Sequence, residues 1–195
     1  MKNLISMLPF LEAEELNELI LKIKENNGEY KGLRLEPLLP YLNDVVIDNL
    51  FIEKLNNNEE PVSMAPFVSD EAMNELLKLF LDNQINIKIQ KFIPFFNNDQ
   101  ITMLFEKVKI EEYNGLKIEH LLPFLNDDNI DGLVEVRLSQ NLRISSILPF
   151  MSDEAKGKLV DSYISGNNNI NINELMPFLT KEQIKKVFNY ELEKE

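Results

Sequence analysis

The chain of 195 residues carries 20 basic and 33 acidic side chains, which gives a formal net charge of -13. Such a field repels phosphate backbones and anionic membrane surfaces, so we expect neither nucleic acid nor a membrane as a partner. The absence of cysteine excludes disulfides, thiolate nucleophiles and cysteine metal sites, and it suits a reducing compartment. With 44% hydrophobic residues the chain can bury a sizeable core. No stretch approaches the roughly 20 apolar residues that span a bilayer, so we expect a folded cytoplasmic protein.

A proline-centred motif recurs along the whole chain at intervals of 26 to 31 residues. The motif prolines are Pro9, Pro40, Pro66, Pro94, Pro123, Pro149 and Pro177. The aromatic residues that follow them directly are Phe10, Tyr41, Phe67, Phe95, Phe124, Phe150 and Phe178. The first copy, with Lys2 and then apolar residues, superficially resembles a signal peptide, but it matches the other copies and lacks a cleavage site. A period of this length predicts a repeat array.

Each copy predicts a long α-helix after the aromatic residue. The third position after the proline is occupied by Glu12, Asn43, Ser69, Asn97, Asn126, Ser152 and Thr180, and all but the glutamate are strong helix N-caps. Apolar residues follow at the seventh, tenth and eleventh positions, as in Ile47, Leu50 and Phe51 or in Ile184, Val187 and Phe188. These spacings place the apolar residues on one buried stripe of a helix, and Lys156 is the exception.

The segment before each proline leaves two alternatives open. The alternation in Leu116-Lys117-Ile118 suits a short strand. A helix capped by Ser145 or Asn173 would instead place the following proline in its first turn, where the missing N–H costs nothing. We favour a short first helix, preceded by an extended Leu-x-Ile connector.

These patterns predict an all-α fold, a right-handed α-solenoid of about seven two-helix repeats of roughly 28 residues, in a single domain over residues 1–195. The general layout, helix pairs with a proline and an apolar ladder, resembles the HEAT and armadillo-like repeats. The Leu-Pro-Phe-Leu segment is also similar to short helical repeats of uncharacterised bacterial proteins. Both resemblances imply a fold and no activity.

Acidic residues gather just after the cap, and we take them as the candidate binding residues. They are Asp44, Asp70, Glu71, Asp99, Asp127, Asp128, Asp153 and Glu154, with Glu182 in the last copy. Carboxylates in the first turn complement the helix dipole, which alone explains their presence. Stacking of the copies would also align them into an acidic ridge that a basic partner could recognise.

Three other patterns have structural interpretations. The aromatic row could be a stacking platform, but its apolar flanks favour a place in the core between repeats. Asp127-x-Asn129-x-Asp131-Gly132 begins like a calcium loop, yet Leu138 stands where a bidentate glutamate is needed. His120, the single histidine, occupies a position that is polar in most copies, so we expect it at the surface.

The sequence contains no glycine-rich phosphate loop, no Gly-x-Ser-x-Gly and no His-Glu-x-x-His. We therefore expect a non-enzymatic scaffold that binds a protein or peptide, with a basic partner favoured by the charge, and with no cofactor and no metal. The alternative is a structural or self-associating spacer. The polar residues 190–195 argue against this alternative, so we favour a monomer. A minor alternative is an acid–base hydrolase.

Overall fold

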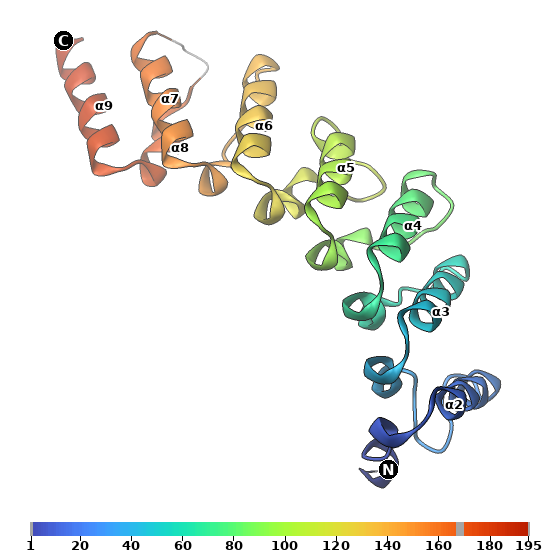
Figure 1. The fold of residues 1–195 in the computed structure, drawn as a ribbon. Helices are drawn as coiled ribbons and strands as arrows, with labels where there is room; N and C mark the ends of the chain where they lie inside the picture. The colour runs from blue at the N-terminus through green and yellow to red at the C-terminus, as the bar shows by residue number, and fades with distance from the viewer. Residues whose placement is uncertain (1, 167–169, 195) are drawn as a thin grey trace. The chain divides into compact units, whose positions relative to one another are not determined.

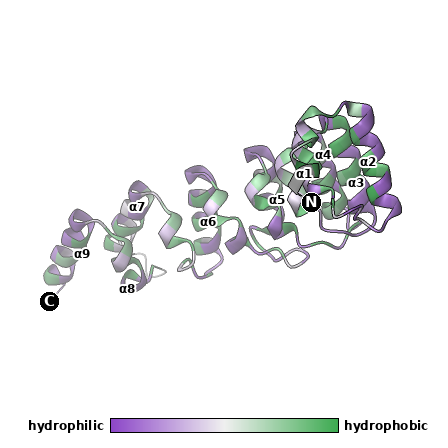
Figure 2. Cartoon of the chain, turned by 90° about the horizontal axis from the view of Figure 1, so that it is seen from below, coloured by the Kyte–Doolittle hydropathy of each residue, from purple (hydrophilic) through white to green (hydrophobic). Residues whose placement is uncertain are grey.

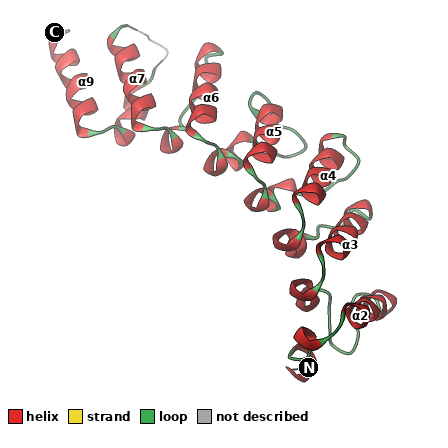
Figure 3. Cartoon of the chain, viewed as in Figure 1, coloured by secondary structure: helices red, strands yellow, loops and turns green. Residues whose placement is uncertain are grey.

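The computed structural model describes residues 2–166 and 170–194, and in this part of the chain every regular element is helical (Figures 1 and 3). The prediction of an all-α protein is confirmed. The α-helices are α1 (Lys2–Ile5), α2 (Ala13–Glu25), α3 (Asp44–Asn56), α4 (Asp70–Leu81), α5 (Asn98–Val108), α6 (Asp127–Ser139), α7 (Asp153–Ile164), α8 (Ile172–Leu175) and α9 (Lys181–Glu193). None of the described helices is long and apolar enough to cross a membrane.

Short 3-10 helices precede the long α-helices, and seven of the nine in the described residues contain a motif proline. They are η1 (Leu8–Phe10), η2 (Glu36–Tyr41), η3 (Val62–Phe67), η4 (Ile89–Lys91), η5 (Ile93–Phe95), η6 (Ile118–His120), η7 (Leu122–Phe124), η8 (Leu148–Phe150) and η9 (Met176–Phe178). The chain divides into two compact parts, residues 1–100 and 101–195, with the division inside α5. In the first part α3 packs on α4 and η2 on η3, and in the second part α7 packs on α8 and α9. The single domain stays a prediction.

The predicted N-caps are confirmed. Asn43 Oδ1 accepts a hydrogen bond from the backbone N–H of Val46 at 2.9 Å, and Ser152 Oγ accepts one from Ala155 at 3.0 Å. Ser69, Asn97, Asn126 and Thr180 make the equivalent bond to the residue three places on. The cap side chains thus satisfy an N–H that has no partner inside the helix, and an asparagine, serine or threonine starts the long helix in each of these copies.

The predicted apolar stripes are buried in α3 to α7, while the first and last long helices differ: on α2, Leu16 and Ile20 are buried and Leu19 is half-buried. Ile47, Leu50 and Phe51 are all buried on α3, and Lys156 is buried at the exceptional position, where its Nζ lies 3.0 Å from Asp153 Oδ1. On α9 only Val187 of the expected residues is buried. Ile184 and Phe188, which the pattern also placed in the core, are exposed. The prediction of a buried stripe is therefore wrong for these two residues.

Among the described residues, the short first helix that we favoured is an α-helix at α1 and α8 and a 3-10 helix in the inner copies. The proline lies at the first or second helical position of η1, η5, η7, η8 and η9, where its missing N–H is tolerated as expected. Ser145 caps no helix, because its hydroxyl donates to the carboxylate of Glu174 instead. Asn173 lies inside α8, whose N-cap is Asn171. Residues 84–88 have no regular secondary structure, as an extended connector requires.

Candidate binding surfaces

The eight candidate acidic residues all lie in the first turn of a long helix, and all are exposed. Their carboxylates face the positive end of a helix dipole, which stabilises each helix by about 0.3–1 kcal/mol per group. Some also make side-chain contacts: Asp70 Oδ1 accepts from Asn97 Nδ2 at 3.1 Å, and Glu154 Oε1 lies 3.2 Å from Lys158 Nζ. The structure thus confirms their local placement, while the acidic ridge as a binding surface stays a prediction.

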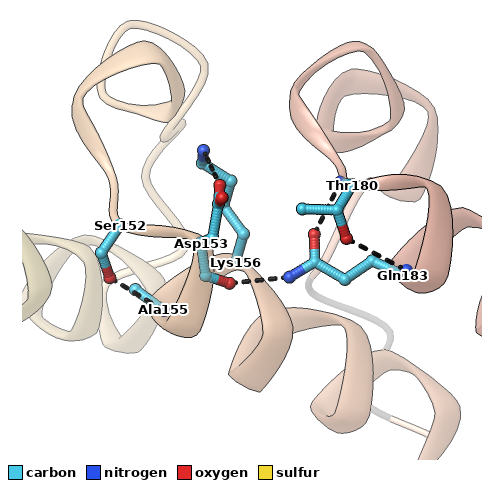
Figure 4. Close-up of polar contacts among 6 residues, drawn as sticks. All are labelled: Ser152, Asp153, Ala155, Lys156, Thr180 and Gln183. Atoms are coloured by element: carbon cyan, nitrogen blue, oxygen red, sulfur yellow. Dashed lines mark hydrogen bonds and ion pairs between the residues drawn. The ribbon is translucent and has the colours of Figure 1, made fainter.

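Two glutamines join the first turns of successive long helices, and Figure 4 shows one of them, Gln183. Gln183 Oε1 accepts from the backbone N–H of Thr180 at 2.9 Å, and its Nε2 donates to the backbone carbonyl of Asp153 at 2.7 Å. Gln100, at the same motif position, accepts from Asn97 N–H at 2.9 Å and donates to the Asp70 carbonyl at 3.3 Å. One amide side chain therefore caps its own helix and binds the preceding helix.

A second kind of joint uses an aspartate eight positions after the proline. Asp48 on α3 accepts from Ser69, through the backbone N–H at 2.9 Å and through the hydroxyl at 2.6 Å. Asp131 on α6 and Ser152 stand at the same two motif positions. Asp131 is half-buried, however, and its Oδ1 is buried without a hydrogen-bond partner. Burial raises the pKa of the Asp131 carboxyl, against the effect of Lys158, and the neighbouring Asp127 raises it further.

The row of aromatic residues lies at the surface, so the interpretation as a core between repeats is wrong. Phe10 exposes 82% of its area, and the exposed fraction lies between 37% and 41% for Tyr41, Phe67, Phe95, Phe124 and Phe150. Phe178 is half-buried. The motif prolines beside them are exposed as well. Each of these copies therefore presents a proline and an aromatic ring to solvent, and we call this set of residues the proline–aromatic stripe.

The aromatic residue is more exposed than the residues that come before the proline. Those preceding residues fill the core instead: Leu148 and Ile147 are buried before Pro149, and Ile93 and Phe92 before Pro94. The residues next to the aromatic residue are apolar because they belong to this core, so they do not indicate whether the ring itself is buried.

Two clefts open between copies at the loop ends of the helices. The cleft in residues 1–100 has a volume of about 420 Å³, with Ile20 and Leu50 among its lining residues and Lys24, Arg34 and Glu53 beside them. Lys24 pairs with Glu53, and Arg34 Nε lies 3.1 Å from a carboxylate oxygen of Glu29, so these charges are compensated. The cleft in the second part has about 400 Å³ and is lined by Leu138, Arg143 and Glu174, among others. Neither cleft gathers an acid–base pair.

The calcium-like segment and the histidine have local roles. Asp127 and Asp131 lie on α6, a regular helix capped by Asn126, so the segment does not form a calcium loop. No group of three or more potential metal ligands occurs in the described part of the chain. His120 is exposed, as predicted, and its Nδ1 accepts a hydrogen bond from the backbone N–H of Lys117 at 3.0 Å.

Comparison of the chain with protein-family models gave no match, and neither did comparison with curated proteins or with solved structures. The function must therefore be inferred from the surfaces described above.

Proposed function

We propose that the chain is a right-handed α-solenoid of seven helix-pair repeats, which binds an extended protein or peptide segment and carries out no catalysis. Contacts between successive motif copies support the repeat arrangement. Asp48 and Ser69 are 21 residues apart in the sequence, and the pairs Asp70–Gln100 and Asp153–Gln183 are 30 residues apart. Residues at matching motif positions thus make matching contacts, which is what a stacked array requires.

The observation that carries the binding proposal is the exposure of the proline–aromatic stripe. Proline and aromatic side chains offer rigid apolar area that loses little conformational entropy on binding, and exposed apolar patches mark interaction sites. In residues 1–100 the stripe comprises Phe10, Tyr41, Phe67 and Phe95 with their prolines. Figure 2 shows the hydrophobic residues of the chain in green, and they alternate with hydrophilic segments along each helix.

The acidic first turns specify the chemistry of the partner. Three residues after each ring the long helix starts, with exposed carboxylates such as Asp70, Glu71 and Asp99. A cation on the partner could lie over a ring, which is worth about 0.5–1 kcal/mol at an exposed site, and could pair with a carboxylate. The partner that fits best is an extended segment in which apolar residues alternate with arginine or lysine. The proposal therefore includes the acidic ridge as the second element of the same surface.

A peptide of alternating leucine and arginine, carrying a fluorescent label, is the direct probe, and its leucine–glutamate counterpart is the control. We expect the basic peptide to bind in fluorescence anisotropy at about 0.15 M salt and the acidic one not to bind. The double variant Phe67→Ala/Phe95→Ala should weaken binding about 10- to 30-fold, because each ring contributes about 1 kcal/mol. Met103→Ala, which truncates an exposed apolar residue on α5 outside the stripe, should leave the affinity unchanged. Unchanged affinity in the double variant would remove the stripe from the binding surface.

Charge reversal separates the acidic residues from the rings. Glu71→Lys and Asp99→Lys should each weaken binding of the basic peptide, and the loss should shrink as salt rises, since exposed charges are screened. If both reversals leave binding and its salt dependence unchanged, the carboxylates act only on their own helix dipoles. A hydrolase has less support, because the buried polar side chains among the described residues are Gln100 and Lys156, and the carboxylate oxygen that is buried without a partner, Asp131 Oδ1, belongs to a half-buried side chain.

A further inference from the structure

Helix α9 leaves one apolar face uncovered. Ile184, Phe188 and Leu192 follow one another at intervals of four residues, so they lie on one side of the helix. They expose 39%, 61% and 57% of their area. The other side of the helix is covered, because Val187 is buried and α9 packs on α7. Helix α9 is therefore packed against its neighbour, and only one of its sides is uncovered.

Ile184 and Phe188 stand at the seventh and eleventh positions after the proline, and these positions are buried in every earlier long helix. The residues concerned are Leu16 and Ile20, Ile47 and Phe51, Met73 and Leu77, Ile101 and Phe105, Ile130 and Val134, and Lys156 and Val160. The eighth position lies next to them and contacts the following copy, as Asp48 does with Ser69. The seventh and eleventh positions thus belong to the side that receives the next helix. On α9 that side has the same apolar chemistry and no cover in the described structure.

The first long helix carries the matching side. The tenth position of the motif is buried in α3 to α7 and α9, but Leu19 on α2 is only half-buried. Glu15 and Glu18, at the sixth and ninth positions, are exposed beside it. The sixth position is the one that reaches back to the preceding helix, as Gln100 does when its Nε2 donates to Asn74 Oδ1 at 2.9 Å. This side of α2 therefore corresponds to the side by which other helices pack on their predecessor.

The charges on the two sides are complementary. Gln100 and Asn74 show that the sixth position of one copy meets the eighth position of the copy before it. The eighth position on α9 is Lys185, so the same register would place Glu15 of another molecule against Lys185. The ninth position meets the twelfth, as Lys186 does with Asp161 at 3.1 Å. Glu18 would accordingly face Asn189, which can donate a hydrogen bond to it.

We propose that α2 of a second copy of this chain docks on the exposed face of α9, in the register of the contacts between neighbouring helices. Leu19 of one molecule then covers Ile184 and Phe188 of the other, and Glu15 pairs with Lys185. The interface joins two different surfaces, so it continues from molecule to molecule rather than closing a dimer. It is independent of the proline–aromatic stripe. We expect the contact of one helix layer to bury less than the roughly 1,200 Å² of a stable interface, so the association should be weak.

Sedimentation velocity of the whole chain, from about 10 µM to about 1 mM at about 0.15 M salt, tests the proposal. The mean mass of the natural sequence should rise with concentration and pass that of a dimer at the upper end. Phe188→Glu should weaken association at least about tenfold, because it places a charge in the apolar contact. Val45→Glu, which changes an equally exposed apolar residue outside both faces, is the matched control and should associate like the natural sequence.

The charge pair distinguishes this interface from any other self-association. Glu15→Lys and Lys185→Glu should each weaken association by about 2- to 5-fold, and the double variant Glu15→Lys/Lys185→Glu should restore it. All four positions tested are exposed, so the variants should fold, which circular dichroism checks. A mass that stays that of a monomer up to about 1 mM overturns the proposal. So does a closed dimer that responds to Phe188→Glu but not to Glu15→Lys, since it would join two α9 faces.

Discussion

Replacing Gln183 with alanine removes both hydrogen bonds that the side chain makes at the start of α9. The N–H of Thr180 loses its acceptor at 2.9 Å, and the Asp153 carbonyl on α7 loses its donor at 2.7 Å. Each bond contributes about 0.5–1.5 kcal/mol net, and alanine recovers a few tenths through its higher helix propensity. We expect a loss of about 1–2 kcal/mol in the free energy of unfolding. In urea, followed by circular dichroism, the midpoint should fall by about 0.5–1 M.

Gly157 provides a second measurement of the same contact. A Cβ added at Gly157 would lie 3.3 Å from Gln183 Nε2, which is a tight approach. Alanine in place of a glycine inside a helix stabilises by up to about 1 kcal/mol, so Gly157→Ala should give this gain in full only when Gln183 is also alanine. Gly132→Ala on α6 is the matched control, because nothing lies within 4 Å of its added Cβ. It should stabilise equally in both backgrounds.

Two results would refute this reasoning. One is an unchanged midpoint for Gln183→Ala, which would mean that water replaces both hydrogen bonds without cost. The other is a gain for Gly157→Ala that equals the gain for Gly132→Ala in both backgrounds, which would mean that the side chain of Gln183 does not lie against Gly157 in solution.

Three further predictions concern polar groups between copies. Asp131→Asn should stabilise the protein by about 0.5–1.5 kcal/mol at pH 7, because burial raises the pKa of this carboxyl and its ionised form destabilises the fold. The gain should vanish near pH 3, where the carboxyl is protonated in the folded and the unfolded state, and urea titrations at both pH values will measure it. Ser69→Ala should cost about 1–2 kcal/mol in the same assay, because it removes an N-cap and the 2.6 Å hydrogen bond to Asp48. Glu60→Gln should cost about 0.5–1 kcal/mol at pH 7, since the hydrogen bond from Lys91 lowers the pKa of the Glu60 carboxyl. The difference should shrink as the pH falls toward that lowered pKa, which thermal melts over a series of falling pH values measure.

Features that depend on neighbouring residues in the sequence could be predicted. Asn43 and Ser69 cap helices by bonding the residue three places on, so a few letters suffice to identify them. The stripe that contains Ile47, Leu50 and Phe51 follows from the helical period alone. The exposed candidate carboxylates were placed correctly for the same reason, because the first turn of a helix is defined by its cap.

Features that depend on another copy could not be predicted in this way. Gln183 reads as an ordinary cap-box residue, and its bond to the Asp153 carbonyl spans 30 residues. Phe188 matches the buried positions of earlier copies, but burial there requires a further helix on that side. The exposure of Phe95 could not be predicted because its neighbours are apolar, and a 3-10 helix of three residues leaves no clear period in the sequence. Comparing the first and last copies with the inner ones was the available signal for the face of α9.

The central claim is that the aromatic residue after the motif proline lies at the surface in six of the seven copies, and a pair of phenylalanines three residues apart tests it most directly. Phe92 is fully buried and meets Phe51 edge to face, with ring centroids 6.1 Å apart, whereas Phe95 exposes 38% of its area. In urea unfolding, Phe92→Ala should cost about 3–5 kcal/mol and Phe95→Ala less than about 1.5 kcal/mol. Equal losses of unfolding free energy, or a larger loss for Phe95→Ala, would mean that the aromatic row is buried in the core and would contradict its role in binding.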